Sequence, residues 1–250
     1  MNKVYFDSAA TTQIREEVID RMTQVLKETY GNPSSTHSHG RSAKSQIEQA
    51  RKTVAEILNV KASEIVFTSG GTEADNLALN SAVRDLGVQR IITSRLEHHA
   101  VLYTVEQLQE CFEIEVEYVD VTACGDIDLQ NLEERLKASQ KKTLVSLMHV
   151  NNEIGNMLDL QETAELVKSH GALFHSDTVQ SIGHFKLDLE KIPVDFTAVS
   201  AHKFHGPKGV GFAFVRRNSG LKPLIFGGEQ ERGHRAGTEG VHNIAGLEEA

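Results

Sequence analysis

The chain has 250 residues, of which 39% are hydrophobic and 24% are charged, an ordinary balance for one or two globular domains. Its formal net charge of −9 argues against a general nucleic-acid binder, which needs a basic face. No apolar run approaches the roughly 18 residues of a membrane span. The two cysteines, Cys111 and Cys124, are too few for a disulfide framework. We therefore expect a protein of the reducing cytoplasm that neither binds nucleic acid directly nor enters a membrane.

The apolar pattern along the chain predicts an α/β fold. Residues 1–60 carry two helical patterns, around 14–26 and 47–58, and no strand, so we expect them to pack against the main domain. Beyond them, strands are expected at 64–68, 90–93, 114–119, 143–148, 172–175, 196–199 and 210–215. Helices are expected from 72, at 98–110, 129–136 and 160–169, and again from about 243. Strands separated by helices imply right-handed crossovers and a mostly parallel sheet sandwiched by helices.

Five of these strands are followed directly by a cluster of polar residues. The clusters are Ser69-Gly70-Gly71-Thr72-Glu73, Glu97-His98-His99, His149-Val150-Asn151-Asn152-Glu153, Ser176-Asp177-Thr178-Val179-Gln180 and Ser200-Ala201-His202-Lys203. Ligands bind at the carboxyl ends of the strands in a parallel sheet, where these clusters should meet. Five clusters at equivalent places predict a binding site on one rim of the sheet.

The first cluster has the residues of an anion site. Glycines let the backbone approach an anion closely, and the free N–H groups at a helix start favour negative charge. Taken alone, the same residues also fit a simple strand–helix turn with Thr72 as the N-cap. The chain has neither the G-x-G-x-x-G nor the G-x-x-x-x-G-K-[ST] pattern, which removes the main support for nucleotide binding.

Asp177 and Lys203 each have a structural and a chemical interpretation, and a histidine pair adds a third candidate. Asp177 follows an apolar strand, where a carboxylate needs an N–H or cationic partner such as a protonated heterocycle, or is simply an N-cap. Lys203 is either a surface lysine or, in a partly dry pocket, a nucleophilic amine suited to a Schiff base. His98 and His99 are adjacent and so face different directions, and one of the two is suited to stack on a planar ligand and move protons. The histidines show no H-E-x-x-H or cysteine-paired zinc pattern, so we predict no metal site.

An anion cradle, an acid for a ring nitrogen, a Schiff-base lysine and a stacking histidine together describe a pyridoxal-phosphate site. With these residues in place, the chain closely resembles the NifS/IscS-type cysteine desulfurases of the class V aminotransferase superfamily, which have fold type I. The matching stretches are 7–12, 31–35, 67–73, 97–101, 149–155, 177–180, 200–203, 206–209 and Arg235-Ala236-Gly237-Thr238. Their order and spacing make the joint signal strong.

The resemblance implies a role for each matching residue. Lys203 would form the Schiff base with the cofactor, His98 would stack on its ring and help move protons, and Asp177 would keep the ring nitrogen protonated. Gln180 and Asn152 would contact the phenolic oxygen side. The phosphate would be bound by Gly71, Thr72, Ser200 and His202, while Thr238 would reach the phosphate of the neighbouring subunit of a homodimer.

The implied reaction converts L-cysteine to L-alanine and leaves the sulfur as a protein persulfide for iron–sulfur cluster assembly or tRNA thiolation, through an acceptor or scaffold protein. The resemblance places the sulfur-accepting cysteine, the arginine that grips the substrate carboxylate and most of a small domain downstream of Ala250. Cys111 and Cys124 match no family motif, and we interpret them as structural or surface thiols.

The expected organisation is an N-terminal arm at 1–15, a cofactor-binding large domain at 16–240 that includes the helical region 16–60, and the start of a helix at 241–250. Two alternatives stay open. One is a different class V enzyme, such as a selenocysteine lyase or an aminotransferase, and the other is a non-catalytic fragment or scaffold that binds pyridoxal phosphate.

Overall fold

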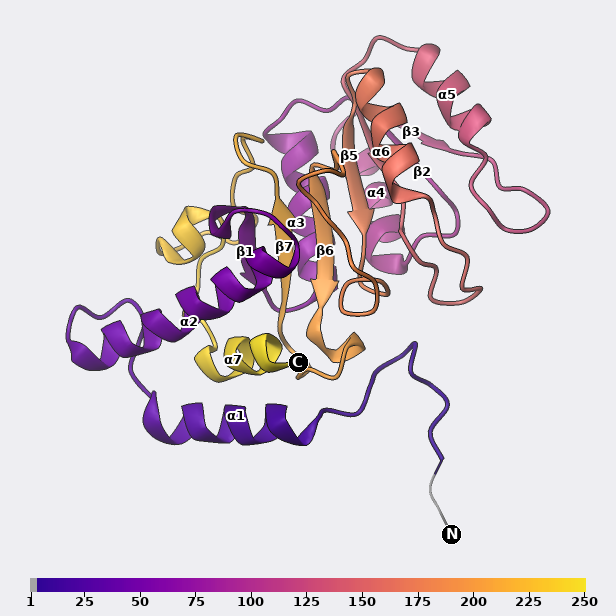
Figure 1. Ribbon diagram of the computed structural model, residues 1–250. Coiled ribbons are helices and arrows are strands. Elements are labelled where there is room, and N and C mark those ends of the chain that lie inside the picture. Colours follow the sequence, from indigo (N-terminus) through magenta and orange to yellow (C-terminus); the bar gives the residue numbers. More distant parts are fainter. Residues whose placement is uncertain (1–3) are drawn as a thin grey trace.

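The computed structural model describes residues 4–250, so Met1–Lys3 of the expected N-terminal arm lie outside the described residues. A seven-stranded sheet runs through the centre of the molecule in the order β1-β7-β6-β5-β4-β2-β3 (Figure 1). Its strands are β1 (Ile65–Thr68), β2 (Arg90–Thr93), β3 (Glu115–Tyr118), β4 (Thr143–Ser146), β5 (Leu173–Asp177), β6 (Phe196–Ser200) and β7 (Gly211–Val215). Each lies within about two residues of its predicted position, which confirms the mostly parallel α/β class.

Strand β7 runs antiparallel to its neighbours in this mostly parallel sheet. It pairs antiparallel with β6, where Ala198 lies opposite Ala213, and antiparallel with β1, where Phe67 lies opposite Phe212. The reason is the connection between β6 and β7, which contains only the short 3-10 helix Ala201–Lys203 and no helix that crosses the sheet. A parallel pairing needs such a crossover, so the chain turns back instead. The two antiparallel pairings of β7 thus agree with the prediction of a mostly, and not wholly, parallel sheet.

Helices cover both faces of the sheet. They are α1 (Glu16–Glu28), α2 (Ser38–Ile57), α3 (Gly71–Arg84), α4 (His99–Cys111), α5 (Leu129–Lys137), α6 (Leu160–Ser169) and α7 (Val241–Glu249). Leu79 of α3 and Val101 of α4 pack with Leu144 of β4 on one face. On the other face, α2, α5 and α6 pack over Phe174 of β5 and its neighbours. Burial of these apolar stripes holds the three layers together.

Helix α2 begins earlier than its sequence pattern predicts. The expected helical pattern covers 47–58, whereas the helix starts at Ser38, with His37 as its N-cap. The first turns hold buried Gly40 and Ala43, and Gly40 lies against the Ser35 and Asn32 carbonyls. Small residues carry little hydrophobic signal, so a helix that packs through them is hard to see in the sequence.

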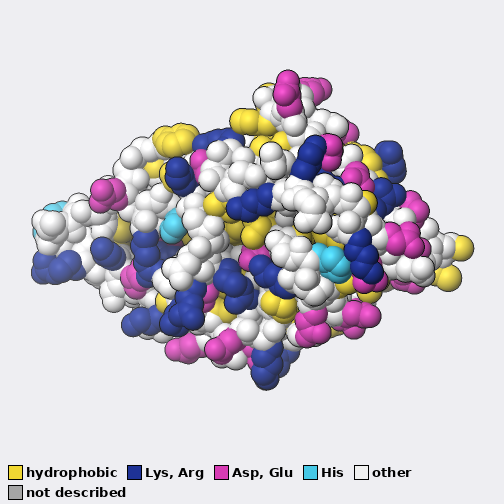
Figure 2. All heavy atoms as spheres, turned by 90° about the horizontal axis from the view of Figure 1, so that it is seen from above, with side chains coloured by type: hydrophobic (Ala, Val, Ile, Leu, Met, Phe, Trp, Pro, Cys, Tyr) yellow, Lys and Arg dark blue, Asp and Glu magenta, His cyan; other side chains and the backbone are white. Residues whose placement is uncertain are grey.

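Two helices far apart in sequence meet at the edge of the molecule beside β1. Helix α7 packs against α1 and α2, and α2 also contacts β1 (Figure 1). On the face shown in Figure 2, acidic and basic side chains are interspersed, so the net charge of −9 is not gathered in one block there. No helix within residues 4–250 is long and apolar enough to cross a membrane.

The free edge of β1 is closed by a buried ion pair. Arg51 of α2 donates to Glu231 at 2.6 and 2.9 Å, and both side chains are almost fully buried. The same two groups satisfy backbone atoms of β1, since Arg51 donates to the Ile65 carbonyl and Glu231 accepts from the Phe67 N–H. The pair therefore takes the place of a missing neighbour strand and fastens the 226–240 segment to the sheet.

Candidate functional site

The carboxyl ends of five parallel strands meet at one rim of the sheet, around a cavity of about 450 Å³. Nine of the ten predicted site residues line this cavity, namely Gly71, Thr72, His98, Asn152, Asp177, Gln180, Ser200, His202 and Lys203. Thr238 does not line it and instead faces a separate cavity beside Tyr30 and His242. The cavity is thus built from the five polar clusters that the strand pattern brings together.

Helix α3 presents its N-terminus to one end of the cavity. Gly70 has φ +152° and ψ −174°, a conformation open essentially to glycine alone. A Cβ on Gly71 would lie 2.5 Å from Cγ2 of Val179, so the backbone approaches the neighbouring loop more closely than any other residue would allow. The first N–H groups of this 14-residue helix point out of its N-terminus and, beside Ser200 and Thr72, suit an anion.

Glu73 is the one acidic side chain in the first turn of α3, and an ion pair with Arg235 keeps it from occupying the anion site at the helix N-terminus. Glu73 accepts hydrogen bonds from Arg235 at 2.8 Å and from the Ser69 N–H at 2.8 Å. Burial opposes the charge of Glu73, but these hydrogen bonds outweigh it and lower its pKa. The negative charge is held by the arginine, so the helix N-terminus stays favourable to an anion.

Asp177 lies at the end of β5 and is only 4% exposed. Its carboxylate accepts a hydrogen bond from the Val179 N–H at 2.9 Å and has no cation bonded to it within residues 4–250. Burial raises the pKa of Asp177 to about 7. A cationic N–H donor entering the cavity would stabilise the ionised form.

Lys203 projects from the 3-10 helix that follows β6 and is partly buried. Its ammonium donates to the Ala9 and Ala10 carbonyls of the N-terminal segment, the second at 3.0 Å. Burial lowers the pKa of Lys203, and the opposing charges of Asp177 and Asp7 only partly offset it. An amine with a lowered pKa, held at a cavity wall by two carbonyls, is suited to act as a nucleophile.

His98 is the N-cap of α4, and its Nδ1 accepts a hydrogen bond from the Ala100 N–H at 3.1 Å. That hydrogen bond requires Nδ1 to be unprotonated, so a neutral His98 carries its proton on Nε2. The ring is exposed and lines the cavity, where it is free to cover a planar ligand. The expected helix at 98–110 is thus confirmed, with His98 serving as its cap.

The N-terminal segment borders the cavity and is tied to its rim. The Thr12 N–H donates to the His202 carbonyl at 2.9 Å, and Gln180 Nε2 donates to the Ala9 carbonyl at 2.8 Å. In Figure 1 this segment passes the carboxyl ends of β5 and β6. Asp7, Ala9 and Ala10 line the cavity beside Lys203. The segment therefore helps to shape the site.

Two buried carboxyl groups were assigned no role from the sequence, Asp75 at the cavity and Glu97 beside it. Asp75 of α3 lines the cavity and is 1% exposed, and burial raises its pKa well above the ordinary value. Glu97 accepts from the Met148 N–H at 2.9 Å, and burial raises its pKa too. The sequence does hold a signal for Asp75, because a charged residue there precedes Ala78 and Leu79 at helical spacing and so falls on the buried face of α3.

The cysteines lie away from this site. Cys111 ends α4 and Cys124 lies in the loop before α5; both are exposed, and neither lines the cavity. Within residues 4–250 no group of three His, Cys, Asp or Glu side chains is arranged to hold a metal ion.

Comparisons with known proteins agree with this arrangement. The family model described as "Aminotransferase class-V" matches residues 4–250. Cysteine desulfurase IscS of Dictyoglomus turgidum is 44% identical over 99% of this chain, and the putative cysteine desulfurase IscS 1 of Bacillus subtilis is 44% identical over 100% of it. The chain spans 63% and 66% of the length of these two curated relatives.

Solved structures give the same match. A NifS-like protein superposes with a TM-score of 0.94 and 41% identity, covering 99% of this chain and 68% of its own. A structure described as SspA in complex with cysteine has a TM-score of 0.92 and 37% identity, covering 98% of this chain and 71% of its own.

Proposed function

Because the chain belongs to the class V aminotransferase family, we propose that it forms the cofactor-binding part of a pyridoxal-phosphate-dependent cysteine desulfurase. The observation that carries the proposal is the single cavity in which Lys203, Asp177 and the α3 N-terminus face one another. The named relatives, 44% identical, support the desulfurase branch of the family. The structure of SspA with cysteine supports L-cysteine as the substrate.

The residues fit the proposed cofactor at each of its polar groups. The α3 N-terminus, Thr72, Ser200 and His202 would hold the phosphate, because the glycines leave room for close approach. Asp177 lacks a cation and would pair with the protonated ring nitrogen. When bound, pyridoxal phosphate supplies an aldehyde that captures amines and a ring that withdraws electrons from the α-carbon of an amino acid.

The remaining chemistry belongs to the side chains of this chain. Lys203 Nζ would hold the aldehyde and, once displaced by the substrate amine, would move the proton at the substrate α-carbon. His98 would cover the ring and share that proton transfer through Nε2. Asn152 and Gln180 would contact the phenolic oxygen. The substrate sulfur would pass to a thiolate, which gives L-alanine and a persulfide.

The acceptor thiol and the assembly also belong to the proposal. We place the acceptor cysteine outside this chain, since Cys111 and Cys124 lie away from the cavity. A homodimer, in which Thr238 reaches the partner's phosphate, accounts for a predicted site residue that faces away from its own cavity. A sulfur-acceptor or scaffold protein in the cytoplasm would complete the pathway.

The direct test is to map the lysine that holds the cofactor. We expect the purified chain with pyridoxal phosphate to show a visible absorption band, and borohydride to fix the pyridoxyl group on Lys203. The Lys203→Ala variant should lose the absorption band and the fixed pyridoxyl group. The Lys208→Ala variant, which changes an exposed lysine of the same loop, should keep the band and the label. Label scattered over surface lysines in the wild-type chain would contradict the proposal.

A second assay identifies the reaction. With L-cysteine and dithiothreitol as the thiol acceptor, a desulfurase produces alanine and sulfide in equal amounts. Products other than these, from a chain that holds the cofactor on Lys203, would contradict the desulfurase assignment.

A further inference from the structure

A buried polar cluster lies behind Asp177, on the side of the sheet that α3 covers. Side chains alternate along a strand, so His175 and Asp177 of β5 point to the same face, and Ser146 of the neighbouring β4 lies beside His175. Asp75 of α3 reaches the same place from the helix layer. Asp75 is 1% exposed, and His175 and Ser146 are fully buried.

The histidine ring is held on both sides. Its Nδ1 lies 2.9 Å from Ser146 Oγ, and its Nε2 lies 3.3 Å from Asp75 Oδ1. Neither Asp75 Oδ1 nor His175 Nε2 makes a well-aligned hydrogen bond to any described residue. Because these atoms are buried and close together, one proton between them would satisfy both.

The surroundings decide the charge of this pair. Glu97 and Asp177 are buried carboxyl groups nearby, while Lys203 and His98 stand at the cavity wall. Burial raises the pKa of Asp75 well above its ordinary value and lowers the pKa of His175 to about 4, so burial favours the neutral form of each group. A neutral Asp75 donates its proton to Nε2, and the Nδ1–H of His175 then donates to Ser146 Oγ.

We infer that Asp75 and His175 are positioning residues for Asp177, which share one proton as a neutral buried pair and leave Asp177 to present the negative charge to the cofactor's ring nitrogen. A charged His175 would neutralise Asp177 from behind and compete with the ring nitrogen. An ionised Asp75 would oppose the ionisation of Asp177. The role toward the ring nitrogen rests on the proposed function, whereas the protonation state of the pair does not.

The protonation state is measured on the cofactor-free protein by ¹⁵N NMR of the histidine rings, with His175 assigned by loss of its signals in His175→Gln. We expect a protonated Nδ1 and an unprotonated Nε2 that stay unchanged between about pH 5 and about pH 8. A doubly protonated ring at neutral pH, or a proton on Nε2 alone, would overturn the inference, whether or not the chain binds the cofactor.

The effect on Asp177 is measured as the pH profile of pyridoxal-phosphate affinity in wild type, Asp75→Asn and Asp75→Ala. The amide of Asp75→Asn mimics the neutral acid, so its profile should match wild type. In Asp75→Ala, cavity water reaches His175 and lets it charge, so the affinity relative to wild type should fall about tenfold as the pH drops through about 6.5. A loss that is the same at every pH, or no loss, would assign Asp75 a purely structural role.

The NMR measurement and the affinity profile distinguish failure of the proposed function from failure of the inference about Asp75 and His175. A wild-type chain that fails to bind pyridoxal phosphate contradicts the proposed function, while the NMR measurement still decides the state of the pair. A wild-type chain that binds normally, with a charged His175, contradicts the inference alone.

Discussion

The buried carboxyl group of Asp177 lowers the free energy of unfolding of the cofactor-free chain at neutral pH. Its pKa is about 7 in the folded chain, against 3.8 for the ordinary group, because burial disfavours the charge. Between these values the unfolded chain has released the proton that the folded chain retains. The free energy of unfolding therefore falls as the pH rises from about 4 to about 7, and the loss remains above that window.

We expect Asp177→Asn to remove this penalty. Relative to wild type, the cofactor-free variant should gain stability as the pH rises through that window, by roughly 2 to 4 kcal/mol at pH 8. Urea unfolding at a series of pH values measures the difference. A difference that does not change between pH 4 and pH 8 would show that Asp177 titrates normally in the folded chain.

At the scale of one element, the start of α3 combines close packing with ligand binding. We expect Gly71→Ala to push against Val179, from which its Cβ would lie 2.5 Å. The substitution should cost about 1 to 3 kcal/mol of unfolding free energy and weaken the binding of the cofactor phosphate. Gly240→Ala is the control, because its Cβ would meet atoms no nearer than 3.7 Å. Equal melting temperatures for the two variants would contradict this account.

The elements also show what the sequence can and cannot predict. Long apolar strands and polar strand ends have clear patterns, and these located the sheet and the nine cavity residues. The direction of β7 depends on a connection without a crossover helix, and the pattern of β7 itself is the same in either direction. The importance of Asp75 depends on His175, which is far away in sequence and meets it only across the helix–sheet interface, so its helical position alone did not identify it.

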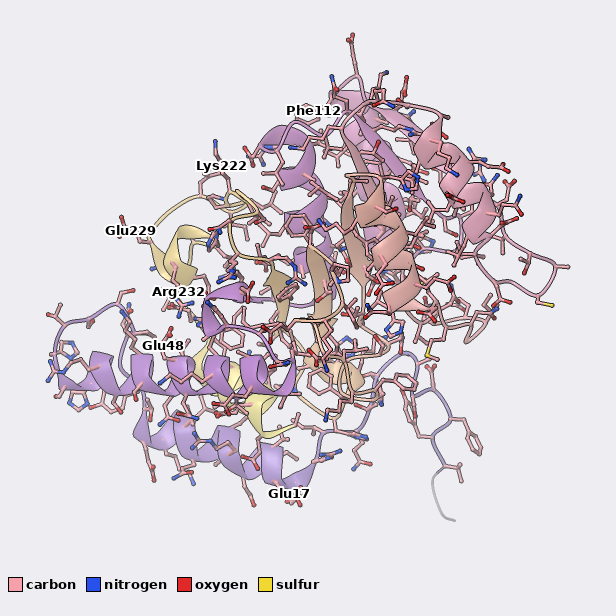
Figure 3. The ribbon with its side chains drawn as sticks, turned by 45° about the horizontal axis from the view of Figure 1, so that its top comes forward. Glu17, Glu48, Phe112, Lys222, Glu229 and Arg232 are labelled. Atoms are coloured by element: carbon pink, nitrogen blue, oxygen red, sulfur yellow. The ribbon has the colours of Figure 1, made fainter. Side chains whose placement is uncertain are left out.

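At the scale of the whole molecule, the 226–240 segment depends on the ion pair at the β1 edge. Glu231→Gln removes the buried carboxylate that pairs with Arg51 and leaves it only the more exposed Glu48 at 3.2 Å, and we expect a loss of about 3 to 5 kcal/mol. The neighbouring Arg232→Ala removes a more exposed side chain, which lies 2.7 Å from Glu48 (Figure 3), so it should cost about 1 kcal/mol or less. Thermal or urea unfolding of both variants tests this, and similar losses in the two would contradict the special role of the buried pair.

The position of α7 has a consequence for the order in which the molecule acquires its structure. The apolar faces of α1 and α2 are completed by a helix that begins only at Val241, and Arg15 donates to the Ala250 carbonyl at 3.1 Å. During synthesis, α1 and α2 therefore remain incompletely packed until the residues of α7 have been made. Closing so long a loop is slow, and it leaves apolar surface open to association in the meantime. Pulsed hydrogen exchange during refolding should find the amides of α1 protected late, after those of β4 and β5.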